Sequence, residues 1–238
     1  MPLEPVQRTS VAGAVFDQLS GEIVSGRIAA GEALPPEREL TERLGVNRQA
    51  IREALQRLDQ LGLVEIRHGG ATRVRDFRQA GGPELLVLML LGQDGGLDAG
   101  VIRSIFELRA AVGADAARLC AQRAVPKALA AIDAVMVEME SATDPLQRLE
   151  LSERFWGLVI DGADNVAYRL LQNSLHRVYE PIRDEAAQLI GDELADVAAH
   201  RKVAIAISKG QERAAELAAR KVLGRGAAAV AAAMTESR

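Results

Sequence analysis

The sequence has little of several features that define common protein classes. It contains one cysteine, Cys120, which excludes an internal disulfide, a four-cysteine zinc site and an iron–sulfur cluster. No apolar run approaches the roughly eighteen residues that a membrane-spanning helix needs. The N-terminus lacks the basic start and apolar segment of a signal peptide. These absences predict a cytoplasmic protein with no membrane partner.

Signatures of common enzymes are also missing. There is no phosphate-binding loop of the GxxxxGK[ST] form, and no nucleophile motif accompanies the serines and histidines. Cys120 lies in an alanine-rich helical segment, which is typical of a small core residue rather than a nucleophile. Asp98 and Glu107 show no pairing that would indicate glycoside chemistry. We therefore expect no enzymatic activity and no cofactor.

What the sequence does contain is a helix-forming composition and an uneven charge. Aromatic residues make up only 3% of the chain, whereas alanine, leucine, glutamate and arginine are abundant. The net charge is −4, but residues 38–78 carry nine arginines and six acidic residues, a local charge of +3. Because charge is local, such a region can bind DNA inside an acidic protein.

The first part of the chain predicts three helices. Apolar residues at helical spacing before Gly26 indicate the first. Pro36 can open a second helix over residues 37–44, because proline is favoured at a first helical position. Asn47 can cap a third helix, since its side chain accepts from free amides of the first turn. The buried stripe of that third helix is Ile51, Leu55 and Leu58.

A hairpin is predicted after the third helix. Residues 64–67 and 72–75 are short extended segments, and the turn His68-Gly69-Gly70-Ala71 joins them. Three helices followed by a hairpin form a winged helix-turn-helix. The fold class is therefore mostly α, with this domain over residues 1–78, a linker at 79–83 and an all-helical bundle over 84–238. Helices of the bundle are expected at about 84–91, 98–123, 126–141, 145–161, 165–190, 192–209 and 211–234, around an interior large enough for a small molecule.

The third helix carries the side chains expected to read DNA. Arg48 and Arg52 are four residues apart and share the face opposite the apolar stripe, and their guanidinium groups fit guanine in the major groove. Each residue alone is also compatible with a solvated helix face, but their position in this pattern favours DNA contact. Further contacts to bases, phosphates or the minor groove are expected from Arg38, Asn47, Gln49, His68 and Gly69.

These residues carry a family resemblance. The chain from Leu34 to Val64 reads LPPERELTERLGVNRQAIREALQRLDQLGLV and closely resembles the DNA-binding domain of the GntR family of transcription regulators, with a hairpin like that of its fatty-acid-responsive FadR type. The resemblance extends from Val11 to Val74 and implies operator contacts by Arg38, Arg48, Gln49, Arg52, His68 and Gly69. Pro36 and Gln49 depart from the family, which usually has Ser or Ala at the first position and a small residue such as Thr at the second. The change at Gln49 can alter the preferred bases.

The C-terminal part resembles the helical effector domain of the FadR subgroup. Most members bind a divalent metal through an Asp and three His. Here Ser152, Trp156 and Val222 stand at three of these positions, and only His200 matches. A single imidazole cannot hold a divalent ion, and His176, on another predicted helix, could pair only with His200. The resemblance therefore implies that the metal site is lost.

The fatty-acid branch of the subgroup also lacks these ligands and binds a long-chain acyl-CoA. The resemblance implies effector contacts by Arg109 and Tyr179. An ion pair of Arg109 with Glu107 or Asp115 is equally compatible with the sequence, and Tyr179 fits a core position. The last helix has Lys221, Val222 and Arg225 where that branch has aromatic and hydroxyl residues.

The expected function is thus ligand-dependent regulation of transcription. A homodimer would bind a palindromic operator, one half-site per subunit, and fatty acyl-CoA would modulate the binding. A small organic acid is the alternative effector. A different class, a ligand-free architectural DNA-binding protein, does not explain so large an appended bundle, although an oligomerisation domain can reach that size. The sequence leaves open which genes are controlled and whether they are repressed or activated.

Overall fold

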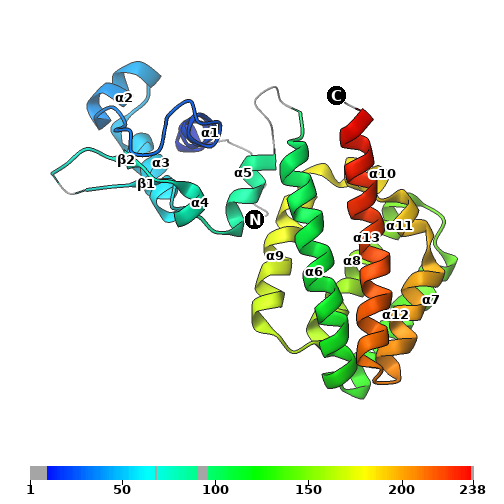
Figure 1. Ribbon diagram of the computed structural model, residues 1–238. Coiled ribbons are helices and arrows are strands. Elements are labelled where there is room, and N and C mark those ends of the chain that lie inside the picture. The colour runs from blue at the N-terminus through cyan, green and yellow to red at the C-terminus, as the bar shows by residue number, and fades with distance from the viewer. Residues whose placement is uncertain (1–9, 68, 91–95, 237–238) are drawn as a thin grey trace, which may run out of the picture. The chain divides into compact units, whose positions relative to one another are not determined.

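A computed structural model describes residues 10–67, 69–90 and 96–236. The chain divides into two compact units, residues 1–97 and 98–238 (Figure 1). The predicted fold class is confirmed, because helices dominate and the described residues contain one small antiparallel sheet. No described helix is long and apolar enough to cross a membrane.

The first unit is the predicted winged helix-turn-helix. Its elements are α1 (Val11–Val24), α2 (Glu37–Leu44), α3 (Arg48–Gln60), β1 (Val64–Glu65), β2 (Arg73–Val74), α4 (Phe77–Ala80), the 3₁₀ turn η1 (Pro83–Leu85) and α5 (Leu86–Leu90). The stripe Ile51, Leu55 and Leu58 of α3 is buried against α1, as expected. The side chain of Asn47 accepts a hydrogen bond from the Ala50 amide at 2.9 Å and so caps α3.

Two glycines allow the tight connections around α3. Gly45 ends α2 with φ of 65°, a left-handed conformation that glycine adopts at no steric cost. Gly62 follows α3 with φ of 72°, and a Cβ atom there would lie 2.5 Å from the Ala80 carbonyl oxygen. Gly45 therefore permits the short turn between α2 and α3, and Gly62 lets the end of α4 lie close to the end of α3.

The wing contains a third extended segment that the sequence pattern did not predict. The strands β1 and β2 are shorter than expected, with Val64 opposite Val74. The loop between α1 and α2 pairs with the other edge of β2, since the Gly31 amide donates to the Val74 carbonyl and the Leu34 amide to the Thr72 carbonyl, each at 2.8 Å. These bonds anchor the base of the wing to the helical part of the unit.

The limits predicted for the two domains differ from this division at residues 84–97. Leu85 is buried in the core of the first unit, and Leu88 and Met89 pack against that core. Burial of these apolar side chains explains why η1 and α5 belong to the winged-helix unit rather than to the bundle. A short helix, α4, also occupies part of the stretch expected to link the domains.

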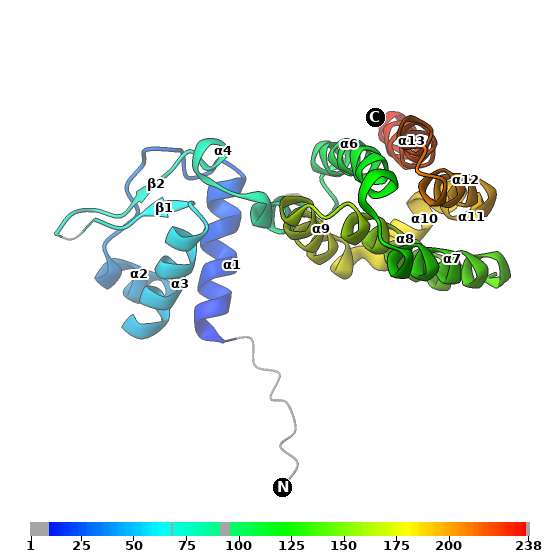
Figure 2. The ribbon, with the colours of Figure 1, turned by 90° about the horizontal axis from the view of Figure 1, so that it is seen from below.

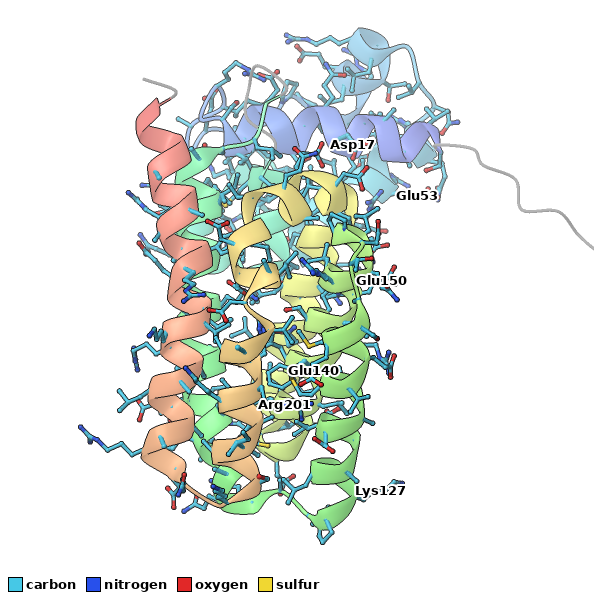
Figure 3. All side chains as sticks on the ribbon, turned by 90° about the vertical axis from the view of Figure 1, so that its right-hand side faces the viewer. Asp17, Glu53, Lys127, Glu140, Glu150 and Arg201 are labelled. Atoms are coloured by element: carbon cyan, nitrogen blue, oxygen red, sulfur yellow. The ribbon has the colours of Figure 1, made fainter. Side chains whose placement is uncertain are left out.

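The second unit is a helical bundle. Its elements are α6 (Ala99–Arg123), α7 (Pro126–Ser141), α8 (Pro145–Gly162), α9 (Val166–Tyr179), η2 (Glu180–Ile182), α10 (Arg183–Leu189), α11 (Gly191–Ala195), α12 (Val197–Ser208) and α13 (Glu212–Glu236). The long helices α6 and α13 lie side by side (Figure 2). On the outside of the bundle, Arg201 of α12 donates to Glu140 of α7 at 2.9 Å and to Asp133 at 2.6 Å (Figure 3).

Two helices predicted as continuous are broken. The helix expected at 165–190 ends at Tyr179, because Pro181 lacks the amide hydrogen needed to continue the α-helical bonds, and the 3₁₀ turn η2 follows. The helix expected at 192–209 is divided at Asp196, whose side chain accepts from the Ala199 amide at 2.9 Å and caps α12. These breaks produce the short helices α10 and α11 beside the interior of the bundle.

Candidate functional site

The exposed face of α3 carries three of the residues predicted to contact DNA. Arg48, Gln49 and Arg52 are all exposed, on the side away from the buried stripe. Two of them have acidic partners within the unit. Nε of Arg52 donates to Glu37 at 3.0 Å, and Nε2 of Gln49 donates to Glu53 at 2.8 Å. Only the fold brings Glu37 of α2 beside α3. Glu53 lies one helical turn after Gln49, so the i, i+4 spacing is a sequence signal that could have identified it.

The other predicted DNA contacts lie around α2 and the wing. The Arg38 side chain is 80% exposed, with Nη1 3.9 Å from a Glu42 carboxylate oxygen. The Asn47 side-chain oxygen caps α3. Its NH₂ group is the part of the side chain that can donate to a phosphate. Gly69 is exposed with φ of 74°, whereas His68 lies outside the described residues.

Part of the positive charge of the wing is engaged within the unit. The Arg67 guanidinium donates two hydrogen bonds to Glu65, at 2.9 and 3.1 Å. Nη1 of Arg73 donates to the Gly31 carbonyl at 2.8 Å and so reinforces the pairing of the third extended segment with β2. These contacts hold the wing in shape and leave its surface partly neutralised.

The bundle contains a largely apolar cavity. Its wall includes Phe106, Val112, Leu149, Trp156, Ile160, Leu175 and Ile190, and its polar side chains are Arg109, Ser152, Glu153, Gln172 and His176. The cavity volume is about 50 Å³, which exceeds the ~15 Å³ needed for one water. It is far below the roughly 300–1,000 Å³ typical of drug-sized sites. In this conformation the cavity suits a small ligand.

Among the described residues that line this cavity, Arg109 is the permanent cation, and it is already paired. Its guanidinium donates two hydrogen bonds to Glu193 of α11, at 2.5 and 3.0 Å. The Glu193 side chain is 0% exposed and the Arg109 side chain 15%. The ion pair suggested by the sequence therefore exists, but the expected partners Glu107 and Asp115 are wrong. Glu107 lies 3.8 Å from Arg103 instead.

The second predicted effector residue, Tyr179, is the last residue of α9, and its side chain lies outside those the structure describes. The same helix lines the cavity with Gln172, Leu175 and His176. His176 lies 3.8 Å from carboxylates of Glu153 and Glu180. Burial raises the pKa of the Glu153 carboxyl. Glu153 and His176 therefore form a cluster of titratable side chains in the cavity wall.

The four positions at which the resemblance implied metal ligands contain one strong ligand. Ser152, Trp156, His200 and Val222 are all buried in the bundle, but only His200 is a strong ligand. Its Nδ1 lies 3.1 Å from the Asp196 carbonyl, and no described residue gives its Nε2 a hydrogen-bond partner. The Trp156 indole packs edge-on against the His200 imidazole, with the two ring centroids 6.0 Å apart. Among the described residues, no cluster of three His, Cys, Asp or Glu side chains can hold an ion.

A winged helix with exposed arginines on its third helix, followed by a helical unit with a cavity, defines a DNA-binding regulator with an effector domain. Residues 11–74 match the family model "Bacterial regulatory proteins, gntR family", and residues 104–225 match "FCD domain". The chain therefore belongs to the GntR family, with an FCD domain as its effector domain, and the resemblance seen in the sequence is confirmed. It is a transcriptional regulator rather than an enzyme.

Curated relatives and a solved structure agree with this assignment. The chain is 38% identical over 223 residues to "HTH-type transcriptional regulator Mce2R" of Mycobacterium tuberculosis, covering 94% of this chain and 92% of that protein. It is 31% identical over 178 residues to a "Fatty acid metabolism regulator protein" of Klebsiella pneumoniae, covering 74% and 72%. The fold matches the solved structure of Lar, which controls the expression of the Listeria monocytogenes agr system, with a TM-score of 0.60 and 16% identity, covering 95% of this chain and 99% of that chain.

Proposed function

We propose that two copies of this regulator bind a palindromic operator, each with α3 in the major groove of one half-site, and that a ligand in the bundle cavity modulates the binding. The observation that carries this proposal is the exposed face of α3, where Arg48 and Arg52 lie opposite the buried stripe. Arginine forks read guanine in the major groove, and a two-fold dimer reads a two-fold site.

Substitution of the two arginines tests the DNA contact. Arg48→Ala and Arg52→Ala should each weaken operator binding by about 1–3 kcal/mol and relax the base preference. Arg213→Ala, an exposed arginine of α13, is the matched control and should bind like wild type. The measurement is fluorescence anisotropy with a selected operator at several salt concentrations. Equal affinity of all four proteins would reject α3 as the recognition helix.

The dimer is tested separately by mass and by stoichiometry. Sedimentation equilibrium should give twice the chain mass, and the palindromic operator should take up two chains. A duplex with one half-site should bind far more weakly, because it engages only one of the two subunits. A monomer in solution that binds both duplexes equally would contradict the proposed symmetry.

For the effector we propose a fatty acyl-CoA that lowers operator affinity. The cavity offers an apolar wall and the cation Arg109, and each CH₂ group buried from water contributes about 0.8 kcal/mol. The relative from Klebsiella pneumoniae is named for fatty acid metabolism. A long acyl chain requires the cavity to open, and that requirement would couple binding to a change in the bundle.

A small organic acid is the second candidate, and the cavity volume favours it. About 50 Å³ is available without rearrangement, so a small carboxylate needs no opening of the bundle. In this case Arg109 would share its guanidinium between the ligand and Glu193.

One titration distinguishes the two effectors. Operator binding is measured with acyl-CoAs of rising chain length and with small organic acids. A response that grows with chain length supports acyl-CoA, whereas a response to small acids alone replaces it with the second candidate. Arg109→Lys keeps a positive charge beside Glu193 but removes the planar fork, so it should weaken the response. Arg103→Lys on the exposed side of α6 is the matched control.

We also propose that the effector domain works without a metal ion. Ser152, Trp156 and Val222 cannot replace the missing ligands, and His200 alone cannot hold a divalent ion. Elemental analysis of the purified protein should find no stoichiometric zinc, nickel or manganese, and a chelator should leave its melting temperature unchanged. One tightly held ion per chain would overturn this proposal.

A further inference from the structure

We propose that Glu53 determines part of the operator sequence. Together with Gln49 it selects a base with an exocyclic amino group, cytosine or adenine, over guanine or thymine on one strand at one position of each half-site. This inference rests on the proposed placement of α3 in the major groove. The sequence pattern did not single out Glu53. Its carboxylate adds a negative charge to the face of α3 on which the arginines are expected to contact bases.

The geometry places the two side chains on the exposed face of α3. Glu53 is one helical turn after Gln49, and both are exposed (Figure 3 labels Glu53). Nε2 of Gln49 donates to a carboxylate oxygen of Glu53 at 2.8 Å. Arg48 and Arg52 precede Gln49 and Glu53 in the chain, so the pair lies directly beside the proposed guanine readers.

The chemistry of the pair follows from what each group can donate. A carboxylate only accepts hydrogen bonds, so Gln49 must turn its NH₂ group toward Glu53. An isolated glutamine reads adenine with one donor and one acceptor. In the pair, Glu53 presents acceptor oxygens to the groove, and one hydrogen of the Gln49 amide is already in use. The outer surface of the pair is therefore rich in acceptors.

Two bases can donate to the Glu53 carboxylate in the major groove. Cytosine offers its N4 amino group and adenine its N6 amino group, whereas guanine and thymine present the O6 and O4 acceptors at the corresponding place. An acceptor facing the Glu53 carboxylate would leave both groups without a hydrogen bond and with like partial charges. Discrimination between amino and keto bases follows.

Selection from randomised duplexes with the full-length protein tests this inference. Wild type is compared with Glu53→Ala and Glu53→Gln. The glutamine variant keeps the shape but gains a donor that tolerates keto oxygens. Asp17→Asn, on α1 and exposed, is the control for loss of one negative charge. Affinities for duplexes that differ only at the selected position then give the amino-to-keto preference.

Wild type and Asp17→Asn should prefer cytosine or adenine at the same position. Both Glu53 variants should lose that preference about tenfold, within the roughly 5- to 150-fold that one good base contact provides, while preferences at the other positions remain. Identical motifs for wild type and both Glu53 variants would overturn the inference alone, because Gln49 and Glu53 would then be only a solvated helix pair. Failure of wild type to select any motif would overturn the proposed function and this inference together.

Discussion

The buried ion pair between Arg109 and Glu193 supports a quantitative prediction about the stability of the bundle. Arg109→Ala leaves the Glu193 carboxylate buried without its partner, and that side chain is 0% exposed. Breaking a buried pair in this way costs about 3–5 kcal/mol. Glu193→Gln leaves a guanidinium that is 15% exposed beside the cavity and keeps one acceptor oxygen. It should therefore cost less, about 1.5–3 kcal/mol.

The assay uses a fluorophore that reports on the bundle. Trp156 is the single tryptophan and is buried in the second unit. Its fluorescence during urea or thermal denaturation follows the bundle even if the winged helix unfolds separately. At about 2–4 °C per kcal/mol, Arg109→Ala should lower the melting temperature of the bundle by roughly 6–20 °C.

An exposed pair on the same helix provides the control. Arg103 and Glu107 lie 3.8 Å apart at the surface of α6, so Arg103→Ala should change stability by less than about 0.5 kcal/mol. A cost below about 1 kcal/mol for Arg109→Ala would refute the argument from burial. An inverted order, with Glu193→Gln the more destabilising, would refute the assignment of the cost to the stranded carboxylate.

Three further predictions concern single residues. Burial raises the pKa of the Cys120 thiol to about 12, so a thiol reagent at pH 8 should label the protein only after unfolding; labelling of the native protein would contradict this. Burial lowers the pKa of His200, so the contribution of the neutral imidazole to the free energy of unfolding should be complete above about pH 6.5. Toward pH 5 the free energy of unfolding should fall by up to ~1.4 kcal/mol per pH unit. This slope should vanish in His200→Leu but persist in His176→Gln. Gly62→Ala places a residue with a side chain in a left-handed backbone conformation and brings its Cβ atom against the Ala80 carbonyl. It should therefore lower the free energy of unfolding of the first unit by at least about 1–2 kcal/mol, measured by denaturation.

Elements encoded by neighbouring residues could be predicted from the sequence. The cap by Asn47, the left-handed turn at Gly45 and the apolar stripe of α3 each depend on residues within a few positions of one another. The same local pattern carried the family resemblance and placed Arg48 and Arg52 on the exposed face. The breaks at Pro181 and Asp196 are also local, but the apolar periodicity on both sides concealed them.

Short segments of the sequence therefore specify the class of the protein, because helix spacing, caps and the order of elements are local. The packing of the helices, in contrast, selects which side chains have partners. It joined Arg73 to Gly31 across 42 residues and Arg109 to Glu193 across 84, and it brought Arg52 to Glu37. Such contacts depend on how helices pack, and no periodicity of the chain specifies which acid will meet which arginine. The charge that α3 and the cavity offer to their ligands is set by those partners.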